Sequence, residues 1–440
     1  MTHSPTRTQP THTTVLSSGQ YPGTQEKSII PRLRFPADHR SEGLSQQRVE
    51  LMLLERTMIR HPLPSKPWRR YHSLSRKDLP RALTVDGRFV CPWDHLTRKG
   101  FTDILKSVFF KEEARRIYSP KFTCSHDAIH AHSKKDFLQS VQNKGRMLFS
   151  WLGHSTCLVQ LGGSNILTDP VWAYRVSPFE SFGPARFMNP LLEVEELPPL
   201  DVILISHSHY DHLDLATAKR IGDRALWVVP IGIKGILQSI GISNCVELNW
   251  WETHSLQGRD GLKIDITLTP VQHWSARSLF DRNVTLWGSF AVKSSDKSFF
   301  FGGDTAYCSC FRIIGDLLGP FDLAAIPIGA YKPREYTRNV HCDPVEAVQI
   351  HKDLRARQSV GIHWGTYPLT DEDAIEPPLE LRRAREESGL TAFDFFTLTM
   401  GQVISPGDTP SEDFATVNHD LYNLYMEQIW SRLPVQSSSE

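Results

Sequence analysis

The sequence lacks an excess of charge of either sign. Lys and Arg together number 49, as do Asp and Glu, so the formal net charge of the 440 residues is zero. Proteins that bind nucleic acid usually carry a basic footprint on one face, and the balanced composition argues against this class of partner. A local basic patch is still compatible with the composition.

Long hydrophobic runs are also missing. No stretch of the chain approaches the roughly 20 consecutive apolar residues that a membrane-spanning helix needs. We therefore expect any contact with a membrane to be peripheral, made from one side of the bilayer.

The cysteines are odd in number and scattered along the chain. The seven cysteines form no paired pattern, and no signal peptide opens the chain. Both features favour reduced thiols in an intracellular protein over a disulfide framework. The first acidic residue is Glu26, which leaves an organelle-targeting segment open as an alternative, so the organelle is not predicted. The cysteines are Cys91, Cys124, Cys157, Cys245, Cys308, Cys310 and Cys342.

Hydrophobic residues make up 40% of the chain and charged residues 22%, which suffices for one large domain or two ordinary ones. The chain begins with Ser, Thr, Pro, Gln and Gly in a polar background, a composition typical of disorder. Apolar residues then recur at helical spacing in 47–60 and 96–110. Near the C-terminus, 413–433 predicts a helix that could pack on the domain or on a second subunit, which would make a homodimer. These patterns divide the chain into a disordered segment at 1–45, a mostly helical extension at 46–140, an α/β domain at 141–405 and a tail with one helix at 406–440.

From Arg146 onward the pattern changes to short apolar runs that end at Gly, Pro, Asp or His. The stretch 147–172 indicates two strands joined by a hairpin turn at Gly162 and Gly163. Helical patterns separate several of the later runs. Hairpins mixed with strand–helix units predict an α/β sandwich.

The stretch LISHSHYDHLD, which follows a predicted buried strand, concentrates groups that bind metal. His207 and His209 alternate, so in extended backbone their side chains point the same way. Asp211 and His212 follow in a turn and can fold back to a neighbouring position. Imidazole and carboxylate ligands together suit zinc, or alternatively iron or manganese.

The remaining ligands of such a site should come from other strand ends, because active sites in layered α/β folds gather there. His273, Asp304 and His363 are each a lone polar residue at the point where an apolar run stops. Alone, each is more often a structural residue or a helix cap. Together with His-x-His-x-Asp-His, they predict a metal centre.

Two other groups have metal-like spacing but favour a plainer interpretation. His126, His130 and His132 lie on a predicted helix with only one neighbouring acid, which is typical of a solvated helix face. The pair Cys308-x-Cys310 lacks a second pair, so we interpret it as structural.

Several stretches together carry a resemblance to a known family. WLGHST, ILTDPVW, HSHYDHLD, TPVQHW, GGDTAY and GIHWGTY resemble the metallo-β-lactamase fold superfamily and, within it, the N-acylphosphatidylethanolamine-hydrolysing phospholipase D family. The likeness runs from about Ser150 to about Gly401 and leaves out the first 45 residues and the tail after Pro406. It implies a four-layer αββα sandwich, here with the helical N-terminal extension, and two zinc ions (Zn2+) per chain.

The resemblance also implies roles for individual residues. Asp304 and a hydroxide would bridge the two zinc ions, Asp169 would orient the metal loop without binding metal, and the glycines at 302 and 303 would allow close backbone approach. One zinc would take His207, His209 and His273, and the other would take Asp211, His212 and His363.

The implied reaction is zinc-dependent hydrolysis of N-acylphosphatidylethanolamine to N-acylethanolamine and phosphatidic acid, with the metal-bridging hydroxide attacking phosphorus. Two zinc ions would bring four positive charges, and Asp211 and Asp304 would bring two negative ones. The surplus of positive charge favours an anionic substrate. Tyr210 and His341 match positions that contact substrate in the family. Val340 stands where the family pattern favours a polar amide residue, so fine headgroup or acyl selectivity is not predicted.

A diacyl phospholipid substrate would require docking at a membrane surface. The stretches 67–73 and 177–187 and the pair Trp250-Trp251 supply aromatic and cationic side chains suited to that interface. The alternatives are a soluble hydrolase of the same fold acting on a lactone or another phosphodiester, and a metal-free interaction protein. The full ligand set argues against the last of these.

Overall fold

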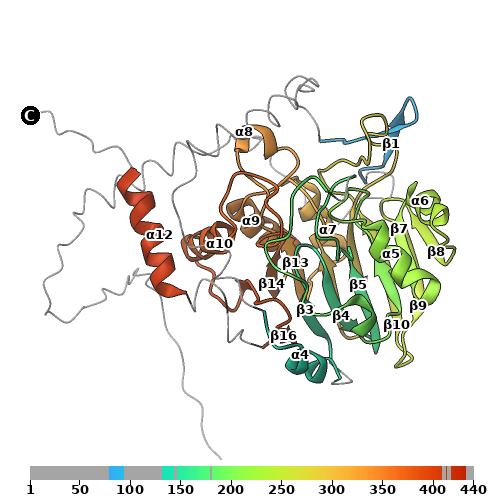
Figure 1. Ribbon diagram of the computed structural model, residues 1–440, viewed down its shortest axis with the longest axis horizontal. Coiled ribbons are helices and arrows are strands. Elements are labelled where there is room, and N and C mark those ends of the chain that lie inside the picture. Colours follow the sequence, from blue (N-terminus) through green and yellow to red (C-terminus); the bar gives the residue numbers. More distant parts are fainter. Residues whose placement is uncertain are drawn as a thin grey trace, which may run out of the picture. The chain divides into compact units, whose positions relative to one another are not determined.

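The computed structural model describes residues 79–93, 131–142, 146–178, 181–408, 413 and 418–432. Within this part of the chain, two seven-stranded sheets form the centre of the fold (Figure 1). The predicted disordered segment 1–45 lies outside the described residues. So do the helical patterns at 47–60 and 96–110, the basic-aromatic stretch 67–73, and His126 and His130.

The first sheet begins as an antiparallel meander and continues as a parallel sheet from β5 onward. Its order is β16-β3-β4-β5-β6-β7-β8. The strands span Val403–Ile404, Leu148–Trp151, Cys157–Leu161, Ser164–Thr168, Val202–Leu204, Leu226–Pro230 and Cys245–Leu248, in that order.

The second sheet has the same mixed character, antiparallel from β9 to β12 and parallel from β12 to β15. Its order is β15-β14-β13-β12-β11-β10-β9. The strands span Phe395–Phe396, Gln358–Ile362, Leu323–Pro327, Ser298–Phe301, Ser289–Lys293, Lys263–Thr269 and Thr253–Gln257, in that order.

Successive side chains of the first sheet alternate between two apolar clusters, as the period of two in a strand requires. In β6, Val202 and Leu204 belong to the cluster between the sheets, whereas Ile203 packs with the helices outside. Across the gap between the sheets, the rings of Phe149 and Phe299 lie 5.8 Å apart. The core therefore consists of two apolar clusters. One fills the space between the sheets and continues beneath the helices of the second sheet, and the other lies beneath the helices of the first sheet.

Helices cover the outer faces and complete the αββα sandwich that the resemblance implied (Figure 1). On the first sheet these are α5 (Leu215–Ile221) and α6 (Ile233–Ser239), with 3-10 turns at Val194–Glu196 and Gly222–Arg224. On the second sheet they are α7 (Cys310–Leu317), α9 (Pro344–Leu354) and α10 (Glu376–Glu387), with the short α8 (Arg334–Thr337) in a connection.

Before the sandwich, the structure describes residues 79–93 and 131–140 of the mostly helical extension expected over 46–140, and one stretch of these is not helical. Residues 83–90 form a hairpin of β1 (Leu83–Val85) and β2 (Arg88–Val90), and the described helix in this range is α4 (Lys134–Ser140). The reason is local. Asp86 and Gly87 both have positive φ, as a two-residue hairpin turn requires, and the flanking residues favour strands. The Asp-Gly pair was the overlooked signal.

The pair Trp250-Trp251 also departs from the expectation of a membrane-facing cluster. Trp250 is buried, and its indole donates a hydrogen bond to the carbonyl of Trp287 at 2.6 Å. The indole of Trp251 donates to the carbonyl of Pro80 at 2.8 Å. Both rings are engaged inside the domain.

After the sandwich, one short stretch of chain reaches the edge of both sheets. β15 pairs with β14 in parallel, and β16 pairs with β3 in antiparallel. The chain then ends its described part in α12 (His419–Arg432), which packs on α10: the Arg382 guanidinium lies 3.9 Å from the centre of the Tyr422 ring. None of the helices that the structure describes is long and apolar enough to cross a membrane.

Candidate metal centre

The centre is built on the loop that follows β6, which we call the ligand loop (residues 207–213). Asp169, at the end of the neighbouring β5, accepts hydrogen bonds from the backbone and hydroxyl of Ser206 at 2.7 and 2.5 Å and lies 2.7 Å from Nδ1 of His212. Both of its oxygens are thereby used, so Asp169 orients the loop instead of offering a ligand. Asp214, the last acid of the stretch, caps α5.

The first ligand group contains His207, His209 and His273. Nδ1 of His209 lies 2.7 Å from Nε2 of His207 and 3.3 Å from Nε2 of His273. Nδ1–H of His273 donates to the carbonyl of Val340 at 2.8 Å, which leaves its Nε2 lone pair facing the group. Val340 contributes a backbone atom here, so the departure from the family pattern at this position leaves the contact intact.

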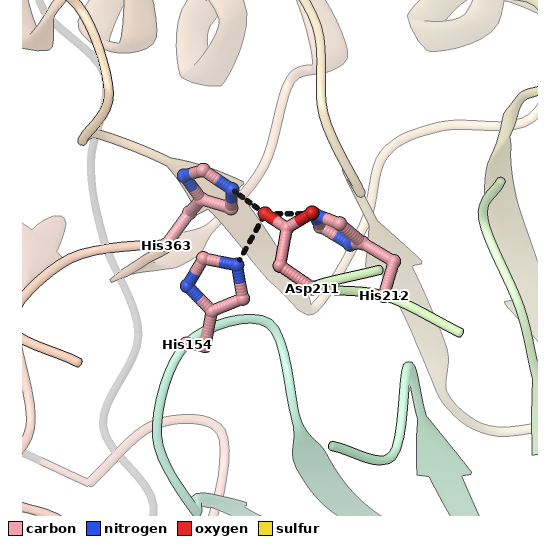
Figure 2. A group of neighbouring side chains, drawn as sticks. All are labelled: His154, Asp211, His212 and His363. Carbon is pink, nitrogen blue, oxygen red and sulfur yellow. Dashed lines mark hydrogen bonds and ion pairs between the residues drawn. The ribbon is translucent and has the colours of Figure 1, made fainter. Parts of the chain in front are cut away.

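The second group surrounds the carboxylate of Asp211 with three imidazoles (Figure 2). Oδ2 of Asp211 lies 3.0 Å from Nε2 of His154, 3.4 Å from Nε2 of His212 and 3.6 Å from Nε2 of His363. His154 was not predicted as a site residue. The sequence carries the same indication for His154 as for His273, Asp304 and His363, because it is a polar residue that follows an apolar run, here that of β3.

Asp304 lies between the two groups. Its Oδ2 is 3.1 Å from Nε2 of His212 and 3.7 and 3.9 Å from Nε2 of His273 and His207, and its Oδ1 is 3.0 Å from Nε2 of His363. The carboxylate can therefore serve both groups at once. The preceding Gly303 has a φ of 56°, and a Cβ there would lie 2.6 Å from that of Ser206. Only glycine lets the turn after β12 approach the ligand loop this closely.

The two further predicted residues occupy different places. Nδ1 of His341 lies 3.9 Å from Oδ2 of Asp304, so the structure brings this imidazole to the centre. The hydroxyl of Tyr210 instead donates to the carbonyl of Arg277 at 2.7 Å, and the Arg277 guanidinium lies 4.2 Å from its ring centre. Tyr210 thus supports the ligand loop from outside.

The arrangement leaves buried polar atoms that a cation would satisfy. Hydrogen-bond partners are lacking for Nε2 of His212, Nε2 of His363 and Oδ1 of Asp304. Such atoms are costly to bury alone. Ligands about 2.0–2.1 Å from a tetrahedral zinc lie roughly 3.3 Å from each other, and the separations in both groups bracket that value. The residues therefore fit two cations that share Asp304.

Without a cation, the pKa values of the imidazoles shift in opposite directions, depending on their surroundings. Burial, reinforced by the neighbouring imidazoles, lowers the pKa of His207 and His273 well below the usual value. Burial also opposes charge on His363, but Asp304 and Asp211 outweigh it and raise the pKa to about 9. The same carboxylates raise the pKa of His212 well above its usual value, against burial. Metal binding at these two residues should therefore release protons.

The weaker metal candidates stay apart from this centre. Cys308 and Cys310 are buried free thiols, and Sγ of Cys310 donates to the carbonyl of Pro270 at 3.2 Å. Neither belongs to a cluster of metal-binding side chains in the described part of the chain.

Comparison with known proteins places this centre among related sequences. Residues 164–364 match the family model of the beta-lactamase superfamily domain. The chain is 43% identical over 326 residues to the N-acyl-phosphatidylethanolamine-hydrolyzing phospholipase D 1 of Caenorhabditis elegans, covering 71% of this chain and 89% of that protein. It is 38% identical over 245 residues to the mitochondrial N-acyl-phosphatidylethanolamine-hydrolyzing phospholipase D of Saccharomyces cerevisiae, covering 54% of this chain and 52% of that protein.

Among solved structures, the metallo hydrolase Igni18 of Ignicoccus hospitalis matches 59% of this chain and 98% of its own. The sequence identity is 23% and the TM-score 0.45.

Proposed function

Because the chain belongs to the N-acyl-phosphatidylethanolamine-hydrolysing phospholipase D family and carries the site of a metal-dependent phosphodiesterase, we propose that it hydrolyses N-acylphosphatidylethanolamine to phosphatidic acid and an N-acylethanolamine with two zinc ions. The observation that carries this proposal is the Asp304 carboxylate, whose Oδ2 lies near imidazoles of both groups and whose Oδ1 lies near His363 of the second group. A centre of this shape suits a two-cation phosphodiesterase.

The donor set supports zinc. His207, His209 and His273 supply nitrogen alone, and the other group adds the carboxylate of Asp211. Imidazole and carboxylate ligands at tetrahedral spacing are typical of zinc, with iron and manganese as competitors. When bound, two such cations would activate a water as nucleophile and offset the negative charge that develops on a phosphate.

The protein's own groups determine what charge the site accepts. Asp211 and Asp304 lie among the imidazoles of the two groups, and their pKa values lie well below the usual range despite burial, because His212 carries positive charge beside both. They remain anionic and hold cations. Two zinc ions would leave a surplus of positive charge, which favours a substrate with an anionic phosphodiester.

His341 and Tyr210 contribute in different ways under this proposal. Nδ1 of His341 is buried without a hydrogen-bond partner and lies beside Asp304, so it is placed to donate to a phosphate oxygen of the substrate. Tyr210 acts through Arg277, whose guanidinium donates to the ligand-loop carbonyls of Ser208 and Leu213 at 2.9 and 2.8 Å. We assign Tyr210 a positioning role.

The test is product analysis on N-acylphosphatidylethanolamine vesicles with the purified full-length protein. We expect phosphatidic acid and N-acylethanolamine in equal amounts, loss of both with the chelator dipicolinic acid, and recovery on adding zinc. In ¹⁸O-labelled water, attack at phosphorus places the label in phosphatidic acid, whereas attack at carbon places it in the N-acylethanolamine.

Elemental analysis of the active protein accompanies this assay. About two zinc ions per chain are expected. Full activity in protein that retains no metal after chelation would overturn the proposal, and iron or manganese at the same stoichiometry would correct the metal alone.

A further inference from the structure

Two surface segments expose large apolar side chains to an unusual degree. Leu279 and Phe280, in the loop 278–284, are 78% and 83% exposed. Leu83 and Val85, on the β1–β2 hairpin, are 60% and 59% exposed. We call this set the apolar rim; its members are Leu83, Val85, Val90, Leu279, Phe280 and Val284.

The two segments are joined by hydrogen bonds, so the apolar rim is one surface. The backbone N–H of Phe89 donates to the carbonyl of Asn283 at 2.8 Å, and the Asn283 side chain donates back to Phe89 at 3.0 Å. The Arg88 guanidinium donates to the carbonyls of Arg282 and Phe280 at 2.5 and 2.7 Å. Figure 1 shows the hairpin, labelled at β1, lying against this loop.

The base of the same loop is fixed to the ligand loop. Arg277 bridges the carbonyls of Ser208 and Leu213, which lie at the two ends of the ligand loop, while its own carbonyl accepts the hydroxyl of Tyr210. A second contact joins the far side of the loop 278–284 to the ligand loop. The Arg282 guanidinium lies 4.3 Å from the Trp274 ring, and that ring lies 4.4 Å from His209.

We propose that the apolar rim is the surface on which the protein docks to a lipid bilayer, and that Arg277 holds this surface in fixed register with the ligand loop. The proposal rests on the proposed function, because the substrate of that function keeps its acyl chains in the bilayer. Leu279 and Phe280 would enter the interface, while Arg88 and Arg282 lie at the level of the headgroup phosphates.

A bilayer is a better partner for the apolar rim than a small ligand, or than solvent alone. A contiguous exposed apolar set usually marks an interaction surface, and here it is flanked by arginines. Arg277 connects the apolar rim to the ligand loop. Docking at the rim would therefore bring the metal centre to the headgroups without drawing the lipid into water. A second copy of the chain is the competing occupant.

The test uses the double variant Leu279→Ser/Phe280→Ser in the full-length metal-loaded protein. Binding is measured by cosedimentation with phosphatidylcholine vesicles, with and without phosphatidic acid and without substrate. We expect binding to weaken by a factor of about ten or more, because two large apolar side chains lose their burial in lipid. Hydrolysis of N-acylphosphatidylethanolamine in vesicles should fall by a similar factor.

Two controls separate docking from damage to the centre. Hydrolysis of a short-chain, monomeric N-acylphosphatidylethanolamine analogue should be unchanged in the variant. The matched variant Leu317→Ser/Phe393→Ser alters two exposed side chains near the amino ends of the parallel strands β12–β14, away from Asp304 and His363, and should bind vesicles like the unaltered protein.

Unchanged vesicle binding in Leu279→Ser/Phe280→Ser would overturn the proposal. Sedimentation velocity distinguishes the competitor: if the variant converts a dimer to a monomer and still binds vesicles, the rim is a subunit interface and the proposal fails. Failure of the unaltered protein to hydrolyse either substrate would count against the proposed function, while the vesicle-binding measurement would still decide the docking surface.

Discussion

The two sheets supply their metal-binding side chains in opposite ways. The first sheet delivers His207, His209, Asp211 and His212 in one loop after β6. The second sheet delivers its residues singly, from the ends of strands that are far apart in the chain, and these are His273, Asp304 and His363.

The difference concerns what fixes each side chain. The ligand loop is one contiguous segment, held by the carboxylate of Asp169 after β5 and by the guanidinium of Arg277, which follows β10 of the second sheet. Asp304 and His363 depend instead on sheet register, because Phe301 pairs with Ala325 and Pro327 pairs with Ile362. One part of the ligand set therefore lies on a single short segment, whereas the other part comes together only once the second sheet has assembled.

The strongest test of this comparison removes the carboxylate that joins the halves. We expect Asp304→Asn to lower kcat/KM by about 10³-fold or more, because an amide cannot neutralise two cations and several kcal/mol of charge stabilisation are lost. Metal content should fall with it. The measurements are steady-state kinetics and elemental analysis, with circular dichroism to verify folding.

The matched control is Asp265→Asn, on β10 of the same sheet, where the carboxylate pairs with Lys263 at the surface. It should keep full activity. Full activity in Asp304→Asn as well would show that the halves do not share a carboxylate.

The next test removes the cations and follows stability against pH. In the metal-free protein the pKa of His363 is raised to about 9 by carboxylates from both halves, against burial. The protonated imidazole contributes its full stabilisation at pH values below the ordinary pKa of 6.5. This stabilisation is lost as the pH rises through about 9. We expect the unfolding free energy of the metal-free protein to fall by about 3 kcal/mol over that range in urea titrations.

The metal-loaded protein provides the control for this titration. A bound cation requires a neutral imidazole, so the decline should be absent there. A flat profile in the metal-free protein would mean that the two halves do not share charge through His363.

A smaller effect is expected at His154, which follows the first sheet's β3 and holds Asp211. His154→Ala should weaken metal binding about 10- to 100-fold, since loss of a group that orients a ligand has effects of that size. His154→Gln should restore much of the affinity, because its amide can donate to Asp211. Competition with a fluorescent zinc chelator measures the zinc affinity of both variants. A His154→Ala variant with the same zinc affinity as the unaltered protein would exclude a positioning role.

The smallest effect concerns the outer support of the ligand loop. Tyr210→Phe removes the hydrogen bond to the carbonyl of Arg277 and should lower the unfolding free energy by about 1 kcal/mol. Metal affinity should stay within about threefold, because the guanidinium contacts of Arg277 remain. A large loss of kcat at unchanged stability would instead assign Tyr210 to substrate contact.

The same contrast explains what could be predicted from the sequence. The ligand loop is a local pattern, and its alternation was sufficient to predict a metal site at a strand end. His273, Asp304 and His363 were found because each interrupts the end of an apolar run. Short apolar runs, with hairpins mixed among strand–helix units, predicted the α/β sandwich, and strands such as β6 are apolar throughout because each face packs against a separate apolar cluster.

What escaped prediction depended on contacts between distant segments. His154 looked like any residue after a strand until the backbone N–H of His363 was seen to donate to its carbonyl at 2.9 Å, which joins the two strand ends. Trp250 was expected at a membrane surface, but it is buried, and its ring packs edge-on against the ring of Trp287, just before β11. The Tyr210 hydroxyl could not be placed without Arg277.

The two short strands β15 and β16 have a consequence for biosynthesis. They close the open edges of β14 and β3, and both lie within residues 395–404, after all the other described strands of the two sheets. A nascent chain therefore emerges from the ribosome with both edges uncovered, which invites pairing with neighbouring chains. Its need for chaperones should persist until this segment leaves the exit tunnel.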